Sequence, residues 1–483
     1  MRTMLIWPRP EQEMVPLIEG LEKGGLKIVY FVGDRTEHCN PTGSIYHDHY
    51  DAWDGKPAPA LADVNIPPLS AKEIEESFRL ESMILTMMNK HFDPAAVDQR
   101  KHTYYTMLAY WRHVLKTVQP EAILFPIVPH SLYNYILFEL AQENKIPTLM
   151  FEETVFDGRL ISYRDFRKSN GALQAALAYN LSRGVMPGDL SKEMRDYWEE
   201  NRGSKRNISK PWFQRELEDR VSGRTLWKIR VRALLRSVSN GSTFRLVFTY
   251  LARQSKGNLT SEYGRVTKAA DFSRAYVYFP LQFQPERTSS PQGGVFHDQL
   301  LAVETLSAAL PRGWEIYVKE HPSQWLLRNK SQYNCVRWRG YYEQLARISG
   351  VRVVPIGTNS YELIEHCKTV AVITGTAGWE ALLRDKLPLV FGWCWYRDCP
   401  GVHGVRSVDE CTRALTNVQA PARHESNMAA FLKAFEQVSI RSNIFQSRDP
   451  KNAVTPEESA TTIAQFILKE LHNPNVQIKH HVP

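Results

Sequence analysis

The sequence has few cysteines and no long hydrophobic run. Its 483 residues include six cysteines, at positions 39, 335, 367, 394, 399 and 411, and no CxxC pair. This excludes a disulfide scaffold and favours a reducing cytosol. No apolar run approaches the roughly 18 residues that span a bilayer, and the apolar segment Met1–Trp7 is too short for a signal peptide. We therefore expect a cytoplasmic protein.

The composition is globular, and the charge is unevenly spread. Hydrophobic residues make up 43% of the chain, charged residues 23% and aromatic residues 11%, which argues against disorder. At roughly 150 residues a domain, the length predicts about three domains or two large ones. The net charge is +8, and residues 201–270 hold 16 Lys and Arg but 4 Asp and Glu, whereas the rest of the chain holds 44 and 48. We expect an anionic partner for this basic segment.

Short apolar runs alternate with helical segments towards both ends of the chain, whereas residues 34–70 are predicted to be loop. Nine strands are expected, at residues 4–7, 26–33, 122–128, 147–151, 275–279, 315–319, 351–354, 369–374 and 388–392. Helices are expected at residues 16–23, 71–118, 131–144, 297–309, 361–367, 378–384, 425–438 and 456–471. This alternation predicts two α/β domains with parallel sheets and crossover helices, which bind ligands at the carboxyl ends of their strands.

The most informative segment is a buried strand that leads through a small polar turn into a helix. The strand ends at Thr374, and the turn is Gly375–Gly378. The first amide groups of a helix are unpaired and suit a phosphate, and Thr374 and Thr376 add hydroxyl donors. The alternative is an ordinary strand-to-helix turn that Thr376 caps.

A second strand end in the same half of the chain carries a lysine and a histidine. The strand at 315–319 delivers Lys319 and His321 to its carboxyl end, where Pro322 stops it. Both side chains can pair with a phosphate, and His321 can protonate a leaving group. A lone histidine is more often structural, but the place of this one at the mouth of the sheet favours function.

The residues after the strand at 275–279 include two amides and a carboxylate. Gln282, Gln284 and Glu286 alternate with apolar residues, so they share one face if the strand continues. Amides and carboxylates hydrogen-bond sugar hydroxyls and base edges well. The alternative is an irregular polar loop.

The first half of the chain brings three carboxylates to one strand end. Glu152, Glu153 and Asp157 follow the strand at 147–151. A general base needs one carboxylate near an acceptor hydroxyl, and neighbouring carboxylates can raise each other's pKa. The alternative is a solvated acidic loop.

Metal binding is not predicted. His47 and His49 have the right chemistry, but no set of ligands with diagnostic spacing surrounds them. Cys394 and Cys399 are two thiols only, and two thiolates do not complete a tetrahedral zinc site.

The basic segment contains an amphipathic stretch at residues 224–238. An apolar face that includes Trp227 and Leu234 is flanked by arginines. This suits a helix on an anionic membrane surface or one that docks an anionic glycan; the alternative is a helix packed within the protein. No nucleic-acid-binding module is visible, so no nucleic acid is expected.

Together these segments resemble the bacterial capsule polysaccharide biosynthesis proteins, a family that includes the β-Kdo transferases of capsule and lipopolysaccharide assembly. The resemblance rests on LQFQPE (281–286), KEHP (319–322), TGTAGWEALL (374–383), FPIVPH (125–130) and FEET (151–154). It covers both α/β domains but not the basic middle segment. It implies a GT-B glycosyltransferase, in which two Rossmann-like domains face a cleft and a basic helical insert lies between them.

The resemblance also implies the roles of the residues. The catalytic candidates are Glu153 or Asp157 as the base, since the acidic motif lacks its immediate glycine, and His321. The donor-side candidates, which would contact the nucleotide sugar, are Gln282, Gln284, Glu286, Lys319, His321, Pro322, Thr374, Gly375, Thr376, Ala377, Gly378 and Glu380. The acceptor-side candidates are His130, Tyr133, Glu152 and Arg159.

We therefore predict a metal-independent glycosyltransferase without a cofactor, which moves a sugar from a nucleotide sugar to a surface polysaccharide or glycolipid. A CMP-Kdo-like donor is favoured, and a UDP-sugar is the alternative. The expected domains are 1–170 (acceptor), 171–270 (basic insert), 271–425 (nucleotide sugar) and 426–483 (crossover helices and tail). The protein would be cytoplasmic or peripheral at the inner face of the membrane. Rival functions are a sugar-nucleotide epimerase and a non-catalytic glycan-binding or export-assembly subunit.

Overall fold

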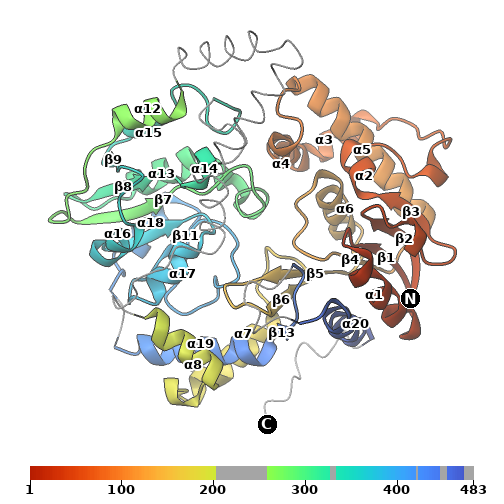
Figure 1. Ribbon diagram of the computed structural model, residues 1–483. Coiled ribbons are helices and arrows are strands. Elements are labelled where there is room, and N and C mark those ends of the chain that lie inside the picture. The colour runs from red at the N-terminus through yellow and green to blue at the C-terminus, as the bar shows by residue number, and fades with distance from the viewer. Residues whose placement is uncertain (203–257, 327–332, 420–421, 446–453, 473–483) are drawn as a thin grey trace, which may run out of the picture.

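The computed structural model describes residues 1–202, 258–326, 333–419, 422–445 and 454–472. These residues form one seven-stranded and one six-stranded sheet, which lie side by side (Figure 1). The first sheet consists of β1 (Arg2–Ile6), β2 (Lys27–Gly33), β3 (Ile45–Asp48), β4 (Ala122–Leu124), β5 (Thr148–Glu153), β6 (Arg159–Tyr163) and β13 (Ile440–Arg441). The second consists of β7 (Tyr276–Pro280), β8 (Glu315–Lys319), β9 (Val351–Val353), β10 (Thr369–Val372), β11 (Leu389–Val390) and β12 (His403–Gly404).

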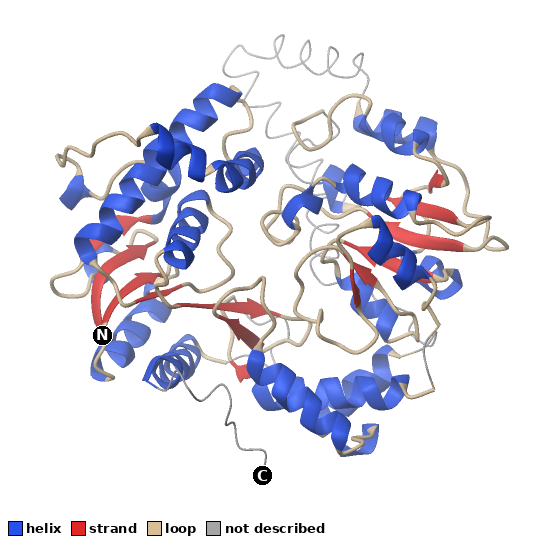
Figure 2. Cartoon of the chain, turned by 180° about the vertical axis from the view of Figure 1, so that it is seen from behind, coloured by secondary structure: helices blue, strands red, loops and turns tan. Residues whose placement is uncertain are grey.

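Helices surround the strands of both sheets, and loops fill the middle between them (Figure 2). In the first half of the chain they are α1 (Glu11–Lys23), α2 (His49–Asp54), α3 (Ala71–Glu76), α4 (Phe78–Met87), α5 (Val97–Val118), α6 (Leu132–Glu143), α7 (Gly171–Ser182) and α8 (Lys192–Asn201). In the second they are α12 (Leu259–Val266), α13 (Gln299–Ala308), α14 (Ser323–Leu326), α15 (Tyr341–Arg347), α16 (Ser360–His366), α17 (Thr376–Leu382), α18 (Val408–Leu415), α19 (His424–Val438) and α20 (Pro456–His472).

Both sheets have Rossmann-like strand orders. The second sheet is all parallel in the order β12-β11-β10-β7-β8-β9, which is the doubly wound arrangement. In the first sheet β3-β2-β1-β4-β5 follow the same order and are parallel, and β6 and β13 are added antiparallel at one edge. The predicted fold of two Rossmann-like α/β units is confirmed.

The last helices return to the first sheet. α19 lies against α7, and β13 pairs with β6, so that Ile440 is opposite Leu160. α20 then packs on α1 (Figure 1), where Ile463 and Ile467 join the same apolar cluster as Leu17. The chain thus crosses from the second sheet back to the first.

The predicted buried strands are present, whereas some surface elements were predicted wrongly. Residues 34–70 are not all loop, because they contain β3 and α2, and the Asp48 side chain caps α2 by accepting from the N–H of Tyr50 at 2.9 Å. The helical stretch 71–118 consists of three helices, with a break at Asp93 and Pro94, where proline disfavours helix. The prediction also missed β6, which pairs with β5.

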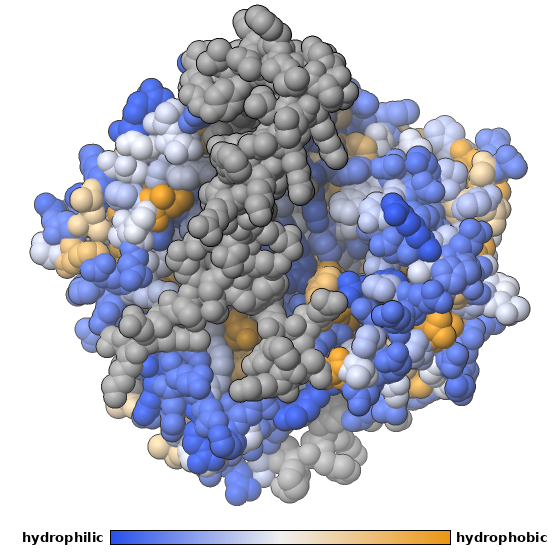
Figure 3. Space-filling view, viewed as in Figure 1, coloured by the Kyte–Doolittle hydropathy of each residue, from blue (hydrophilic) through white to orange (hydrophobic). Residues whose placement is uncertain are grey.

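None of the described helices has the length and apolar character needed to cross a membrane. On the face shown in Figure 3, hydrophobic residues form small patches among polar ones. The amphipathic stretch at 224–238 lies outside the described residues.

Candidate functional site

The site lies where the strand order of the second sheet reverses. β7 and β10 are neighbours, and their connections leave in opposite directions, so a crevice is expected at their carboxyl ends. The two ends are tied together by Gln282 and Thr374. The Gln282 amide Nε2 donates to Thr374 Oγ1 at 2.8 Å, and Thr374 N–H donates to Gln282 Oε1 at 3.3 Å. Both residues are buried.

The loop at residues 281–298 does not continue the strand, so the expected shared face of its amides does not form. Gln284 is buried and donates through Nε2 to the His297 carbonyl at 2.7 Å. Its Oε1 accepts from Gln299 Nε2 at 2.7 Å and from Arg337 Nη1 at 2.8 Å. Gln282 and Gln284 therefore shape the loop from inside, while Glu286 is exposed and accepts from the Thr288 hydroxyl at 2.8 Å.

His321 is held by a buried ion pair. Arg337 Nε donates to Glu320 Oε2 at 2.7 Å, and both side chains are fully buried. Glu320 Oε1 accepts from the His321 N–H at 2.8 Å, and Tyr342 donates to Glu320 Oε2 at 2.6 Å. Charges that are paired and hydrogen-bonded in this way can be buried, so the network fixes the turn that carries His321.

The His321 ring has a defined tautomer. Its Nδ1 accepts from the Ser323 N–H at 3.2 Å, which leaves the proton of the neutral ring on Nε2. Burial lowers the pKa of His321, against the opposing charges of Glu320 and Glu286. At neutral pH, His321 is therefore a neutral Nε2–H donor. Pro322 follows it at the start of the turn into α14.

Lys319 contacts its own domain. Its Nζ donates to the Thr358 carbonyl at 2.6 Å and to Ser360 Oγ at 2.8 Å, and burial lowers its pKa to about 8. The lysine therefore adds positive charge behind the strand end from a fixed position.

The turn into α17 combines an exposed threonine with a buried glycine. Gly375 is the N-cap, Thr376 is exposed, and the Gly375 carbonyl accepts from the Tyr396 hydroxyl at 2.5 Å. A Cβ on Gly378 would lie 2.5 Å from that hydroxyl oxygen, so only glycine fits there. Ala377 and Glu380 are half-buried in the same helix.

A residue of the first sheet reaches this loop directly. Glu152, at the carboxyl end of β5, accepts from Gln292 Nε2 at 2.9 Å, and the Gln292 carbonyl accepts from the Trp393 N–H at 2.9 Å. Glu152 is buried, and burial raises its pKa, against the charge of Arg287. The contact brings the carboxyl ends of the two sheets together.

The other two carboxylates lie differently. Glu153 Oε1 accepts from the Phe445 N–H at 2.9 Å, away from Gln292. Asp157 is in the turn between β5 and β6, where neighbouring Phe156 packs against Trp379 of α17 with ring centroids 6.3 Å apart.

Of the acceptor-side candidates, His130 and Glu152 are at the carboxyl ends of their strands, while Tyr133 and Arg159 are buried in contacts with their own domain. Tyr133 is fully buried and stacks on Trp111, because it lies on the core side of α6. Arg159 is buried in a two-pronged ion pair with Glu193, with both N–O distances 2.8 Å.

His130 is half-buried after β4, and its Nδ1 donates to the Val128 carbonyl at 3.1 Å. Burial and the positive charges of Lys90 and Arg287 lower the pKa of His130 to about 3, so the ring is neutral.

Sequence reasoning missed Arg287, Gln292 and Arg337. Arg287 and Gln292 lie in a loop without periodicity, and Arg337 is far from the motifs in sequence. The signal that points to Arg287 and Gln292 is that they follow Gln284 and Glu286 in the same loop. A loop that lies between two domains is expected to carry polar residues that contact both of them.

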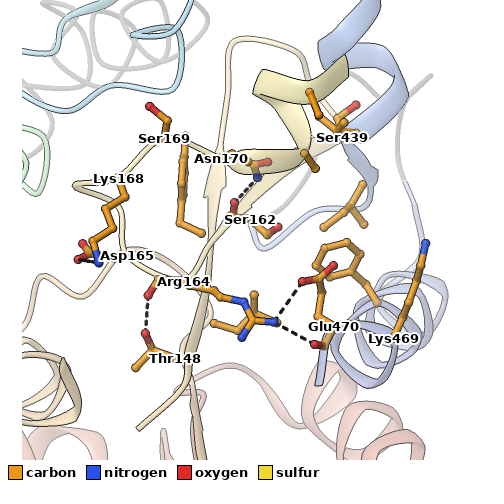
Figure 4. Close-up of a pocket in the computed structure, with 18 of the residues that line it drawn as sticks. Thr148, Ser162, Arg164, Asp165, Lys168, Ser169, Asn170, Ser439, Lys469 and Glu470 are labelled. Carbon is orange, nitrogen blue, oxygen red and sulfur yellow. Dashed lines mark hydrogen bonds and ion pairs between the residues drawn. The ribbon is translucent and has the colours of Figure 1, made fainter. Parts of the chain in front are cut away.

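A cavity in the described residues lies elsewhere. It has a volume of about 1270 Å³ and lies between β6, α7 and α20, near the amino end of β5 (Figure 4). Arg164 points to Glu470 of α20 and donates to its carbonyl at 3.0 Å, and Lys433 pairs with Glu436 at 3.0 Å. Much of the charge is thus neutralised within the cavity wall.

His47 and His49 contact hydroxyl and carbonyl groups of their own domain. His47 is buried, and its two ring nitrogens lie 2.8 Å from the Tyr30 hydroxyl and 3.0 Å from the Lys56 carbonyl. His49 Nδ1 is 2.7 Å from the Tyr133 hydroxyl. Among the described residues, Glu11, His38 and Cys39 form a group with potential metal-ligand atoms, at the surface beside the start of α1.

A family model described as "Capsule polysaccharide biosynthesis protein" matches residues 241–445. Residues 241–445, the capsule-family region, are therefore similar to the capsule polysaccharide biosynthesis proteins. The capsule-family region contains the whole second sheet, the loop at 281–298 and His321, which confirms the predicted resemblance for LQFQPE, KEHP and TGTAGWEALL. It also takes in residues 241–270 of the basic segment, and it does not include FPIVPH or FEET.

No curated protein matches the chain. Among solved structures, the chain is similar to the beta Kdo 2,7 transferase of Thermosulfurimonas dismutans KpsC, with 10% identity, 74% of this chain and 88% of that chain covered, and a TM-score of 0.32. It is also similar to the UDP-GlcNAc 2-epimerase from Methanocaldococcus jannaschii, with 11% identity, 97% and 100% covered, and a TM-score of 0.23. These TM-scores lie below 0.5, and we draw nothing about function from them.

Proposed function

We propose that the protein is a glycosyltransferase that transfers a sugar from a nucleotide-sugar donor to a glycan or glycolipid acceptor during capsule polysaccharide synthesis. The observation that carries this proposal is the hydrogen bond from Gln292 to Glu152, 2.9 Å long. It joins the ligand-binding edges of two Rossmann-like sheets, so a donor on one can meet an acceptor on the other. The similarity of residues 241–445 to capsule polysaccharide biosynthesis proteins supports a role in capsule synthesis.

The donor would lie at the β7–β10 switch point. Its phosphate would face Gly375–Gly378 and the Nε2–H of His321, with Lys319 behind the strand end. When the bond between the sugar and the phosphate oxygen breaks, its electron pair stays on the nucleotide, and these donors stabilise that charge. CMP-Kdo is the favoured donor and a UDP-sugar is the alternative.

The acceptor hydroxyl would give its proton to a carboxylate of the first domain. Glu153 and Asp157 are the residues predicted from the sequence, and we add Glu152, which lies at the domain contact and whose pKa burial raises. A carboxylate with a raised pKa is a stronger base, which suits proton transfer near neutral pH. No metal or cofactor is part of this proposal. All six cysteines are free, in keeping with a reducing compartment.

The proposal is tested by nucleotide binding and turnover. We expect CMP, or else UDP, to raise the melting temperature selectively among CMP, UDP and GDP. His321→Ala should lower turnover by more than about tenfold, because a donor to the leaving group is lost. His102→Ala, at an exposed position in α5, is the matched control.

Other results would contradict the proposal. Conversion of a nucleotide sugar without any acceptor would favour the epimerase. Polysaccharide binding without any nucleotide-dependent thermal shift would favour the non-catalytic subunit.

A further inference from the structure

Arg287 begins a segment, residues 287–292, that contacts both the second sheet and the first domain. Next to it, the Thr288 carbonyl accepts from Thr374 Oγ1 of the switch point at 2.7 Å. Three residues further on, Ser290 Oγ lies 3.0 Å from Thr86 Oγ1 of α4, and Gln292 then reaches Glu152. Arg287 therefore lies on the segment that joins the donor side to the first domain.

The Arg287 guanidinium is half-buried and has no hydrogen bond or ion pair with any residue that the structure describes. Other buried arginines behave differently: Arg337 and Arg159 each bind a carboxylate through two nitrogens. A guanidinium that loses part of its hydration gains most from an anion with two oxygens, which matches its planar fork.

The groups around Arg287 favour an added anion. Its charge acts on Glu152 and on His130, which come from the ends of β5 and β4. His130 is neutral, and the Glu152 carboxyl accepts from Gln292 and forms no ion pair with Arg287. Beside them, Gln292 Oε1 is buried without a donor among the described residues, which suits a hydroxyl of the same ligand.

We propose that Arg287 binds a carboxylate or phosphate group of the substrate and thereby makes the enzyme specific for an acidic sugar or its phosphate. The inference rests on the proposed function and deepens it. Three sources share this chemistry: the carboxylate of the donor sugar, the phosphate of the donor nucleotide, and an acidic group on the acceptor.

Calorimetric titrations separate these sources. CMP, CMP-Kdo, free Kdo and orthophosphate are titrated into the wild-type protein and into Arg287→Gln, Arg287→Lys and Arg312→Gln, the last an exposed control. We expect Arg287→Gln to weaken binding at least tenfold and Arg287→Lys to restore part of it, because lysine keeps the charge but not the fork.

The pattern of loss identifies the bound group. A loss for CMP-Kdo and free Kdo but not for CMP assigns the sugar carboxylate, and equal losses for CMP and CMP-Kdo assign the phosphate. Unchanged donor binding together with a raised KM for an acidic acceptor, but not for a neutral one, assigns the acceptor.

Failure of this inference is distinct from failure of the proposed function. If no nucleotide sugar binds but orthophosphate or free Kdo binds in a way that Arg287→Gln abolishes, the anion site stands and the donor assignment falls. If Arg287→Gln matches Arg312→Gln with every ligand and every acceptor, the inference is overturned.

Discussion

His47 illustrates how much a single buried residue depends on partners that are far away in sequence. A carbonyl oxygen only accepts, so His47 Nε2 carries the proton and donates to Lys56, at 3.0 Å, and Nδ1 accepts from Tyr30. The Tyr30 oxygen lies 2.9 Å from the Tyr110 hydroxyl, which accepts from the Ala58 N–H at 2.9 Å. The hydrogen bonds of this series all run in one direction, from Ala58 through Tyr110, Tyr30 and His47 to Lys56, and the His47 ring is neutral.

The buried, neutral His47 makes the free energy of unfolding depend on pH. Burial lowers the pKa of His47 to about 4, below the roughly 6.5 of an unfolded chain. The unfolded state therefore binds the extra proton as the pH falls from about 6.5 to 4, and the folded state loses stability in that window. We expect His47 to account for a loss of about 2 kcal/mol between pH 7.5 and pH 5.0.

Urea unfolding at the two pH values measures this loss. His47→Gln keeps an amide donor near the place of Nε2 but does not titrate, so its stability should depend less on pH than that of the wild type, by about that amount. The exposed His102→Gln is the control. Equal pH dependence in all three proteins would mean that His47 does not titrate on unfolding.

The same dependence on partners that are distant in sequence explains why part of the site could not be predicted. The places of Thr374, His321 and Glu152 follow from the buried strands that precede them. The roles of Gln284 and Arg337, in contrast, depend on a hydrogen bond between residues 53 positions apart, which no local pattern records.

At the scale of elements, burial on both faces made strands predictable. β2 and β8 are apolar runs that pair with a parallel strand on each side, and their bounds follow closely from the sequence. β3, β6 and β13 are at or near the edge of the first sheet, and β3 and β13 are short, so they lack such a run. Because β6 pairs with β5 antiparallel, Asp157 lies in a hairpin turn rather than in an open loop.

The contact of α1 with α20 gives a prediction for two glycines. A Cβ on Gly20 of α1 would lie 2.9 Å from Ala464 Cβ of α20, whereas a Cβ on Gly264 of α12 would meet nothing within 4 Å. Gly20→Ala should therefore push the helices apart and lower the free energy of unfolding by about 1–3 kcal/mol. Gly264→Ala should instead stabilise by about 0.5–1 kcal/mol through helix propensity.

Hydrogen exchange and thermal melting distinguish the two variants. Gly20→Ala should speed exchange in residues 456–472 selectively, because α20 docks on α1 through this surface. A stabilising effect of Gly20→Ala, like that of Gly264→Ala, would mean that the two helices do not approach so closely in solution.

At the scale of the molecule, two kinds of contact join the sheets. Near the strand ends they include polar contacts such as Gln292 with Glu152 and Ser169 with Asp398, the latter 2.5 Å apart. Around the crossover they are aromatic, and Phe156 packs on Phe435 with ring centroids 4.8 Å apart. Since the polar contacts contribute little net free energy, we infer that the two units can separate at the strand ends while the aromatic contacts act as the pivot.

A like charge at the polar contact tests this motion. Gln292→Glu sets a second carboxyl against Glu152 and the Trp393 carbonyl, where only acceptors meet. Above the pKa values of the pair both carboxyls are ionised and repel each other, although Arg287 offsets part of the repulsion. As the pH falls, a shared proton restores the hydrogen bond.

We therefore expect the radius of gyration from small-angle scattering to be larger at pH 8 than at pH 5. The increase should be about 1 Å on the roughly 23 Å of a compact chain of this length. The wild type and the exposed control Gln344→Glu should not change. If Gln292→Glu also keeps the same radius at both pH values, the aromatic contacts fix the angle between the sheets and a substrate must enter without domain opening.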